Sequence, residues 1–319
     1  NIEIIPFSDV GTMNVTITGF NAAPYMSEVE AIPMDGPYVT LDAFTVNDQN
    51  GNQNTLADYS ETISFDLALK NVGNENANEV EAVLSSEDEY ITLETTEFSV
   101  GAINSEQVVD YENIFSVTIS DSVPDEHTAM FNIEFTDEND SVWVSHFNLT
   151  INAPVLSLDN FVINDDEYGN GNGRLDPGEV INVSIIGYNM GHAASEAAVC
   201  ALSATGEFVE TVISEDEIGT LDVEGNATAE FQIAISPDAT IGSMVEFQFD
   251  LQAGYYMAES YLSTKKIGLV LEDWESGDMS SFEWETAGDQ PWAVTSDQVY
   301  EGAYAIKSGD IDDSQTSDL

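Results

Sequence analysis

The segment between residues 165 and 179 carries the side chains best suited to binding a metal ion. When Tyr168 is counted as position 1 of a twelve-position calcium-binding loop, oxygen-bearing side chains fall at positions 3, 5, 9 and 12, and glycine stands at the turn position 6. These residues are Asn170, Asn172, Asp176 and Glu179, with Gly173 at the turn. Arg174 stands at position 7, where such loops use a backbone carbonyl, and it belongs to the candidate set.

The pattern fails only at position 1, because Tyr168 has no carboxylate. Asp165, Asp166 or Glu167 can supply one, since a loop between strands need not wrap as it does between helices. Calcium takes about six to eight oxygen ligands, and extracellular calcium modules have dissociation constants of about 10⁻⁴ to 10⁻³ M. The segment therefore predicts a structural calcium site of modest affinity.

The same pattern occurs once more, earlier in the chain. Positions 1, 3, 5, 9 and 12 are occupied there by Asn50, Asn52, Asn54, Asp58 and Glu61. Asp48 lies just before the loop, and Thr55 replaces the turn glycine. Two copies at one structural position favour a second calcium site. The alternative is that both segments are Asn- and Gly-rich turns in a chain whose loops are nearly all acidic.

No arrangement typical of an enzyme accompanies these loops. His127, His146 and His192 lack an adjacent nucleophile motif, and neither Gly-x-Ser-x-Gly nor His-Glu-x-x-His occurs. Cys200 falls in phase with the inward-facing residues of its strand, which favours an inert buried thiol. Adjacent carboxylates occur throughout so acidic a chain and are interpreted as solvated loop charge. We therefore expect no catalytic residue.

Two short segments resemble a glycosylation signal. Asp-Ser-Val occurs at 121–123 and again at 140–142, and it resembles the O-glycosylation triplet of Bacteroidota. The resemblance makes Ser122 and Ser141 the candidate acceptor residues.

The segments that must position these loops are predicted to be β-strands throughout. Short runs of alternating apolar and polar residues, such as Thr62–Leu67, recur between clusters of Gly, Asn, Asp and Ser. In the region after residue 153, the residues predicted to face inward are Phe161, Ile163, Val183, Ile185, Ala198, Cys200, Leu202, Phe231, Ile233, Ile235, Phe247, Phe249 and Leu251.

An internal repeat organises these strands. Sliding the chain along itself by 118 positions, the difference 189 − 71, aligns Asn71 and Gly73 with Asn189 and Gly191, and it also aligns the two acidic loops. Each repeat has the seven or so short strands typical of an immunoglobulin-like sandwich. The fold class is therefore predicted as all-β, with tandem immunoglobulin-like sandwiches at 38–153 and 154–268.

Both ends of the chain differ from the repeats. Residues 1–37 hold too few strands for an independent sandwich and are predicted to be a partial β module, which the family resemblance given below makes immunoglobulin-like. Residues 269–319 are rich in aromatic side chains and are predicted to begin a larger β domain, which the same resemblance makes a jelly roll.

Charge excludes several classes of function. The chain has 60 Asp and Glu against 5 Lys and Arg, which gives a net charge of −55, so nucleic acid and anionic lipid are disfavoured as partners. No apolar run approaches the roughly 20 residues that span a bilayer, so no membrane insertion is expected. Salt at about 1 M shortens the screening length to roughly 3 Å, and we therefore expect a saline or divalent-rich environment.

Both ends of the chain resemble parts of one family. The segment 12–32, with Val-Thr-Ile-Thr-Gly-Phe-Asn at 15–21, resembles the immunoglobulin-like domain that follows the catalytic domain in gingipain-type cysteine peptidases. The tail, with Asp-Trp-Glu-Ser-Gly-Asp at 273–278 and Tyr-Glu-Gly at 300–302, resembles the start of their cleaved-adhesin jelly roll. The loop at 170–179 also resembles loops in tandem sandwich repeats of secreted Bacteroidota proteins.

This resemblance implies a secreted or cell-surface protein, exported by the type IX route, whose modules lie between a peptidase and adhesins. It does not imply that this chain is a peptidase, because the family's catalytic His and Cys belong to an upstream domain. No His or Cys of the present sequence lies in a matching motif.

Three functions fit these observations. The first is a non-catalytic extracellular stalk, stiffened by calcium, whose partners are other modules of the same polypeptide, surface glycans, or host and environmental proteins. The second is a filament subunit that joins neighbouring copies head to tail by β-strand complementation. The third is the accessory region of a secreted cysteine peptidase.

Overall fold

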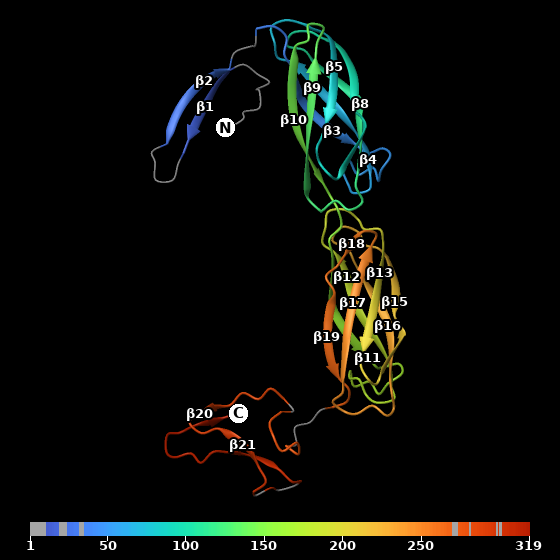
Figure 1. Cartoon of the computed structure of the whole chain (residues 1–319), viewed down its shortest axis with the longest axis vertical. Coiled ribbons are helices and arrows are strands. Elements are labelled where there is room, and N and C mark those ends of the chain that lie inside the picture. Colours follow the sequence, from blue (N-terminus) through green and yellow to red (C-terminus); the bar gives the residue numbers. More distant parts are fainter. Residues whose placement is uncertain are drawn as a thin grey trace.

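The computed structural model consists of β-strands joined by turns and loops (Figure 1). It describes residues 11–18, 24–31, 35–269, 274–280, 282–297, 299 and 302–319. In these ranges no helix occurs, and so none is long and apolar enough to cross a membrane. The prediction of an all-β chain with tandem immunoglobulin-like sandwiches is confirmed.

The first sandwich consists of two four-stranded antiparallel sheets. One sheet has the order β3 (Val39–Asn47), β4 (Thr62–Asn71), β8 (Val108–Ile119) and β6 (Ile91–Thr95). The other has the order β10 (Val142–Ile151), β9 (His127–Thr136), β5 (Ala77–Ser85) and β7 (Glu97–Ile103). The chain enters this sandwich through β3 at the upper end and leaves it through β10 at the lower end, where the second sandwich follows (Figure 1).

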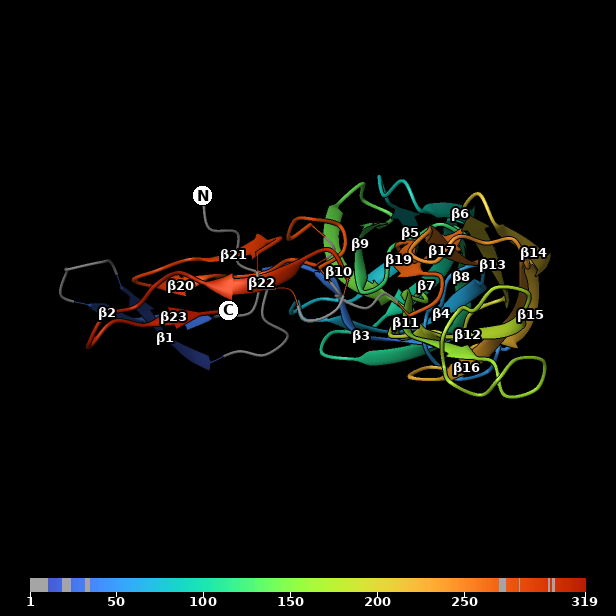
Figure 2. The same cartoon turned by 90° about the horizontal axis from the view of Figure 1, so that it is seen from below.

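The second sandwich repeats this arrangement. One sheet has the order β11 (Leu156–Asn164), β12 (Val180–Asn189), β16 (Asn226–Ile235) and β14 (Val209–Ile213). The other places β15 (Glu215–Thr220), β13 (Ala197–Thr205) and β17 (Met244–Ala253) side by side, with β18 (Tyr256–Met257) and β19 (Tyr261–Lys266) paired to β17. Seen along the long axis, the two sandwiches lie one behind the other (Figure 2).

Alternation along the strands builds both cores. In β4 every second residue is buried, and Phe65 meets Phe131 and Phe147 with ring centroids 5.4 and 5.2 Å apart. In the second sandwich every predicted inward-facing residue is buried except Phe161 and Ile163, which are partly buried and pack against the core. Aromatic and aliphatic burial of this kind supplies most of the driving force for folding.

Cys200 is one of these core residues. Its side chain is fully buried, and burial raises the pKa of the thiol to about 12. The thiol therefore stays protonated at neutral pH and is a poor nucleophile.

The two ends form short two-stranded units. At the amino end, β1 (Gly11–Ile17) pairs antiparallel with β2 (Tyr25–Ala31). At the carboxyl end, β20 (Ala287–Gly288) pairs with β23 (Ser317–Asp318), and β21 (Trp292–Thr295) pairs with β22 (Ala305–Ser308). Several residues that carry the family resemblance, at 19–21, 32, 273, 300 and 301, lie outside the described residues.

Candidate functional site

The predicted metal-binding segment of the second sandwich is a closed loop between β11 and β12, held by hydrogen bonds to its own carboxylates. Asp165 is only 2% exposed, and its two oxygens accept the backbone N–H groups of Asn172 at 2.9 Å and Gly173 at 2.8 Å. Glu179 accepts the backbone N–H of Asn170 through Oε1 at 3.0 Å. The two carboxylates thus hold the loop from both of its flanks.

Asp176 completes this loop through side-chain amides. Its Oδ2 accepts one N–H from Asn170 at 2.8 Å and one from Asn172 at 2.6 Å, and these two bonds lower the pKa of the Asp176 carboxyl. Burial alone would raise the pKa of Asp165, but the backbone N–H donors of Gly173 and Asn172 hold it below its ordinary value. Both carboxylates are therefore ionised at neutral pH.

The first sandwich contains the same loop between β3 and β4. Asn52 donates its backbone N–H to Glu61 Oε1 at 2.9 Å, and the side-chain amides of Asn52 and Asn54 each donate to Asp58 Oδ2 at 2.7 Å. Asp48, 4% exposed, accepts a backbone N–H across the loop at 3.1 Å. Burial raises the pKa of Glu61, and the neighbouring Asp58 and Asp48 charges add to that effect. The sequence repeat thus reflects a repeated hydrogen-bond pattern.

The structure places the remaining candidate residues differently. The twelve-position pattern has no carboxylate at position 1 of either loop. The buried carboxylates nearest to that position in the structure are those of Asp165 and Asp48, whereas Asp166 and Asn50 are exposed at the surface. Arg174 is exposed too, and its backbone N–H donates to a loop amide oxygen at 2.9 Å. The carboxylate that begins each loop therefore lies before the position that the twelve-position spacing assigns to it.

These loops contain carboxylate and amide oxygens, but their side chains are not arranged as a preformed metal site in the described residues. Within the described ranges, no three His, Cys, Asp or Glu side chains form a group that could hold a metal ion. The amide nitrogens of Asn170 and Asn172 face Asp176, so these amides would have to turn over to present their oxygens to a cation. A donor set of oxygens alone fits a hard cation such as calcium.

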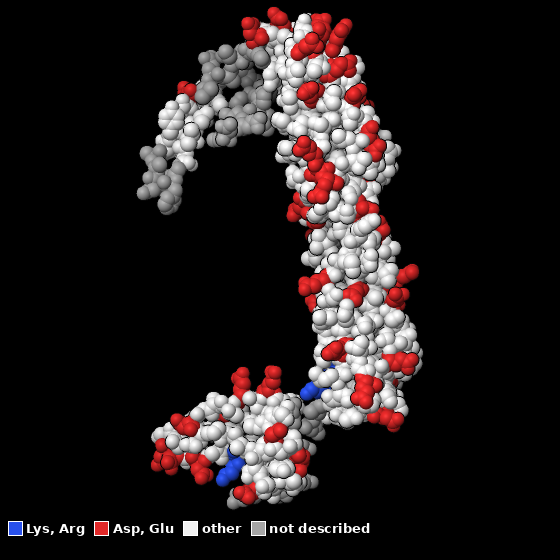
Figure 3. Space-filling model, in the orientation of Figure 1, with Lys and Arg blue, Asp and Glu red and all other residues white. Residues whose placement is uncertain are grey.

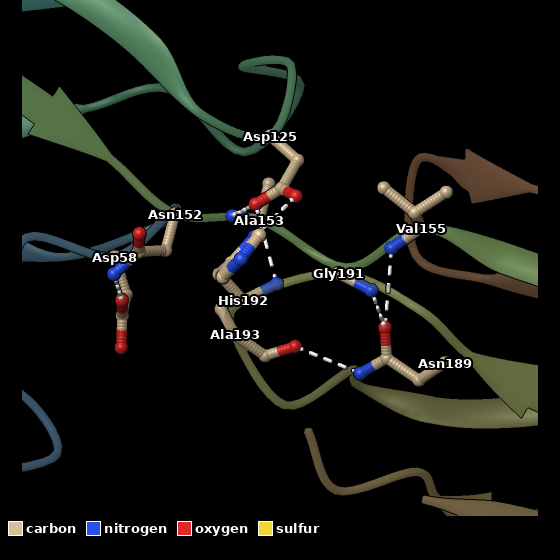
Figure 4. A network of polar contacts seen from close by, with 9 residues as sticks. All are labelled: Asp58, Asp125, Asn152, Ala153, Val155, Asn189, Gly191, His192 and Ala193. Carbon is tan, nitrogen blue, oxygen red and sulfur yellow. Dashed lines mark hydrogen bonds and ion pairs between the residues drawn. The ribbon is translucent and has the colours of Figure 1, made fainter. Parts of the chain in front are cut away.

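The first loop also contacts the joint between the two sandwiches (Figure 4). Asn152, at the end of the first sandwich, donates its backbone N–H to Ala57 O at 2.9 Å and accepts the N–H of Tyr59 at 2.9 Å. Its side-chain amide donates to Asp58 Oδ1 at 3.0 Å. The loop is thus attached to the residue at which the chain leaves the first sandwich.

An ion pair crosses the joint one residue further on. Asp125 of the first sandwich lies 2.8 Å from Nδ1 of His192 in the second, and its other oxygen accepts the backbone N–H of Ala153 at 2.9 Å (Figure 4). Ala153 O in turn accepts the backbone N–H of His192 at 3.1 Å. Hydrogen bonding to Asp125, followed by its charge, raises the pKa of His192. Three segments therefore meet at one carboxylate.

Two tyrosines also cross the joint between the two sandwiches. The Tyr59 hydroxyl donates to Ala194 O at 3.1 Å, and the Tyr256 hydroxyl donates to Val123 O at 2.8 Å, so each sandwich donates one bond to the other. The two rings meet edge to face with centroids 5.1 Å apart, and Tyr256 packs against both cores. A cleft of about 410 Å³ remains between the first loop and the segment that ends at Glu196.

A buried asparagine holds the linker against the second sandwich. Asn189 is fully buried, and its Oδ1 accepts the backbone N–H groups of Val155 at 3.1 Å and Gly191 at 3.0 Å (Figure 4). Its amide donates to Ala193 O at 2.8 Å. A Cβ at position 191 would lie 2.3 Å from Ala153 O, so the close approach of the linker requires glycine there.

The first sandwich holds its own incoming segment in the same way. Asn71 is fully buried, its Oδ1 accepts the N–H groups of Tyr38 and Gly73 at 3.0 Å each, and its amide donates to Glu75 O at 2.8 Å. The sequence alignment paired Asn71 with Asn189 but gave neither a role. Nothing in the sequence marked Asp125 or His192, because their contact depends on two sandwiches meeting.

The two predicted glycosylation positions lie in turns. Ser122 is exposed in the turn that leads to Asp125 at the joint, and its hydroxyl lies 3.0 Å from that of Ser120. Ser141 is partly exposed, and its backbone N–H donates to Asp137 at 2.9 Å. Modification of either serine stays a prediction.

Acidic side chains are scattered over the visible face of both sandwiches, from one end to the other (Figure 3). The few basic side chains seen there lie at the lower end of the second sandwich and in the tail. Such a surface attracts cations along its whole length and repels polyanions.

No protein-family model and no curated protein matches the chain. Among solved structures, the chain is similar to a red sea bream transglutaminase, with a TM-score of 0.29 and 11% identity over 72% of this chain and 31% of that one. It is also similar to the C-terminal domain of the Streptococcus agalactiae AgI/II polypeptide BspA, with a TM-score of 0.32 and 10% identity over 70% of this chain and 99% of that one. Likeness at this level concerns the β architecture, and no functional conclusion rests on it.

We predict that Asn189→Ala destabilises the second sandwich. The substitution leaves the buried backbone N–H of Gly191 and the part-buried N–H of Val155 without their acceptor, and a buried group left unpaired costs about 1–3 kcal/mol of unfolding free energy. Chemical denaturation measures the loss. Asn148→Ala, at an exposed position of β10, is the matched control and should change stability by less than about 0.5 kcal/mol. Equal effects of the two substitutions would contradict the role assigned to Asn189.

We predict that the joint weakens as pH rises through the raised pKa of His192. The imidazolium–Asp125 pair is present below that pKa and is lost above it, while Glu126 and Glu224 also favour the charged imidazole. The effect is small because the His192 side chain is 54% exposed. Melting curves of the wild type and His192→Gln between about pH 6 and pH 9 should converge as the pH rises. Parallel curves would contradict this prediction.

Proposed function

We propose that the chain is a non-catalytic extracellular spacer that holds modules at its two ends a fixed distance apart. The observation that carries this proposal is the joint, where Asp125, His192, Tyr59 and Tyr256 link the two sandwiches by hydrogen bonds in both directions. Because the linker itself is short and held by Asn189, little of it is free to bend. A chain of sandwiches joined in this way transmits position and force along its length.

Calcium in the two acidic loops is part of this proposal. In the second sandwich, Asp165, Asp176 and Glu179 would move together around the ion, and Asn170 and Asn172 would turn their amides over to present their oxygens. The equivalent residues of the first loop would do the same there. The support is the repeated geometry and the all-oxygen donor set. A bound cation would also offset part of the net charge of −55.

The extracellular setting follows from the family resemblance. The ends of the chain resemble modules that lie between a peptidase and adhesins in gingipain-type proteins, where a spacer separates active parts. Type IX export, a saline environment and attachment to a cysteine peptidase belong to the same proposal. The strongly acidic surface supports the saline setting, because salt screens the repulsion between carboxylates.

Calcium should raise the melting temperature of the wild-type chain, compared with chelator in a buffer of matched ionic strength. At a concentration 100 times the dissociation constant, one bound ion adds about 2.7 kcal/mol to the unfolding free energy. Glu179→Ala should abolish the rise for the second sandwich, whereas Glu246→Ala, at an exposed position of β17, should leave it intact. If calcium does not move the wild-type melt, the loops are turns held by hydrogen bonds, and the calcium part of the proposal fails.

A second candidate function, filament assembly, is favoured by the hairpin of β1 and β2. Two strands alone are marginal in water, and Ile17, Tyr25 and Met26 of this hairpin are 55%, 62% and 73% exposed. In the described part of the chain neither strand pairs with a third, so both outer edges can accept a strand from a neighbouring copy.

Light scattering separates the two functions. Head-to-tail assembly predicts that the mean mass grows with protein concentration, and that Val15→Pro in the hairpin reduces this growth by removing a backbone donor. A mass that stays at 34.6 kDa over the whole concentration range would contradict assembly and leave the spacer as the function.

A further inference from the structure

The two acidic loops share most of their internal hydrogen bonds but differ in what they contact outside the loop. The first loop reaches the joint through the bond between Asp58 and the Asn152 amide at 3.0 Å. In the second loop the corresponding exit residue is Gly268, whose backbone N–H donates to Leu175 O at 2.6 Å. Glycine has no side chain with which to reach Asp176. One loop is therefore attached to the joint, whereas the bonds of the other, among the described residues, stay within its own sandwich.

We propose that the first loop is a lock for the joint, so that its state sets the stiffness between the two sandwiches, while the second loop stabilises its own sandwich only. The lock itself needs no cation. Control of the lock by calcium rests on the calcium site proposed above. The experiment below distinguishes failure of the lock from failure of the calcium site.

A continuous series of contacts links the first loop to the second sandwich. Asp58 holds the side chain of Asn152, and Ala153, the next residue, uses both of its backbone polar groups at the joint. Its N–H donates to Asp125, and its carbonyl accepts the N–H of His192 (Figure 4). If the loop opens and releases Asn152, the anchor next to Ala153 is lost. Coupling of this kind passes through direct contacts over a few residues.

Tyr59 provides a second link from the same loop. It directly follows Asp58, its hydroxyl donates to Ala194 O, and its ring packs against Tyr256. Burial and the nearby Glu196 carboxylate raise the pKa of Tyr59, so the hydroxyl remains a donor at neutral pH. A change in the backbone of the loop at Asp58 therefore also moves an aromatic ring within the joint.

In the described residues, the end of the second sandwich that lies away from the joint has no counterpart of Tyr59 or Asp125. The residues aligned with Tyr59 and Asp125 are Pro177 and Ile241, at offsets of 118 (177 − 59) and 116 (241 − 125). Neither has a hydroxyl or a carboxylate, and Ile241 is 57% exposed. In the part of the chain that the structure describes, this end therefore has no counterpart of the Tyr59 and Asp125 contacts, and the second loop serves as the control.

Distances between the two sandwiches test the lock in the full chain. Spin labels on Val142→Cys and Met244→Cys lie at exposed positions of the two sandwiches, and the buried Cys200 stays unlabelled. Asn152→Ala removes the side-chain link to Asp58 but keeps the backbone bonds of residue 152 and all hydrogen bonds within the loop, and Tyr59→Phe removes only the hydroxyl contact. Asp176→Ala perturbs the second loop. Melting curves of each variant verify that both sandwiches are folded.

The lock predicts a broader distance distribution for Asn152→Ala and Tyr59→Phe than for the wild type, and an unchanged width for Asp176→Ala. Equal widths for the wild type and Asn152→Ala, with both sandwiches folded, would overturn the proposal, and so would equal broadening by Asp176→Ala.

Adding calcium tests the control of the lock. We expect calcium to narrow the wild-type distribution but not that of Asn152→Ala, although both proteins bind the ion in calorimetry. If calcium binds neither protein and Asn152→Ala is still broader, the calcium site fails while the lock stands. If calcium binds and narrows both distributions equally, coupling through Asn152 is overturned.

Discussion

Carboxylates in this chain must be stabilised without basic side chains. With 60 acidic residues and 5 Lys and Arg, most carboxylates have no cationic partner available, and the structure uses backbone and amide N–H groups instead. Asp165, Glu179 and Asp58 each accept such bonds within their loops, and Asp125 accepts the N–H of Ala153 at the joint. The loops and the joint are therefore built by the same interaction, a buried or half-buried carboxylate facing N–H donors.

This way of stabilising carboxylates is compatible with a stiff connection between the sandwiches in a highly charged chain. Bonds from backbone N–H groups are short-range and largely insensitive to salt, whereas repulsion between surface carboxylates is screened by salt. The joint depends mainly on such bonds, on Tyr256 packing against both cores, and on one ion pair that is half exposed. The contacts between the sandwiches should therefore depend little on the repulsion between surface carboxylates.

The sequence predicted those features that depend on neighbours along the chain. Strict alternation in the strands identified the core of the second sandwich, because a side chain's face is set by its position in the strand. The spacing of Asn, Asp and Glu identified both loops. The twelve-position count, which comes from loops flanked by helices, found no carboxylate at its first position. Asp165 lies further back because the strands that flank this loop let it approach from before the turn.

The joint could not be predicted in this way. Its members come from positions 58, 125, 152 and 192, which share no periodicity and meet only when two finished sandwiches stack. Asp125 is one of many acidic residues, and His192 has no motif around it. The repeated Asn71 and Asn189 were visible as an alignment, but their buried contacts with the incoming chain require three-dimensional structure.

A rigid joint requires the two sandwiches to move as one body. Nuclear spin relaxation of backbone amides in the full chain measures this directly, since it reports the rotational diffusion of each sandwich separately. A rigid joint predicts one shared, strongly anisotropic diffusion tensor for residues 38–153 and 154–268. Two different tensors, each typical of a single sandwich tumbling alone, would show that the joint is flexible and would contradict the proposed spacer.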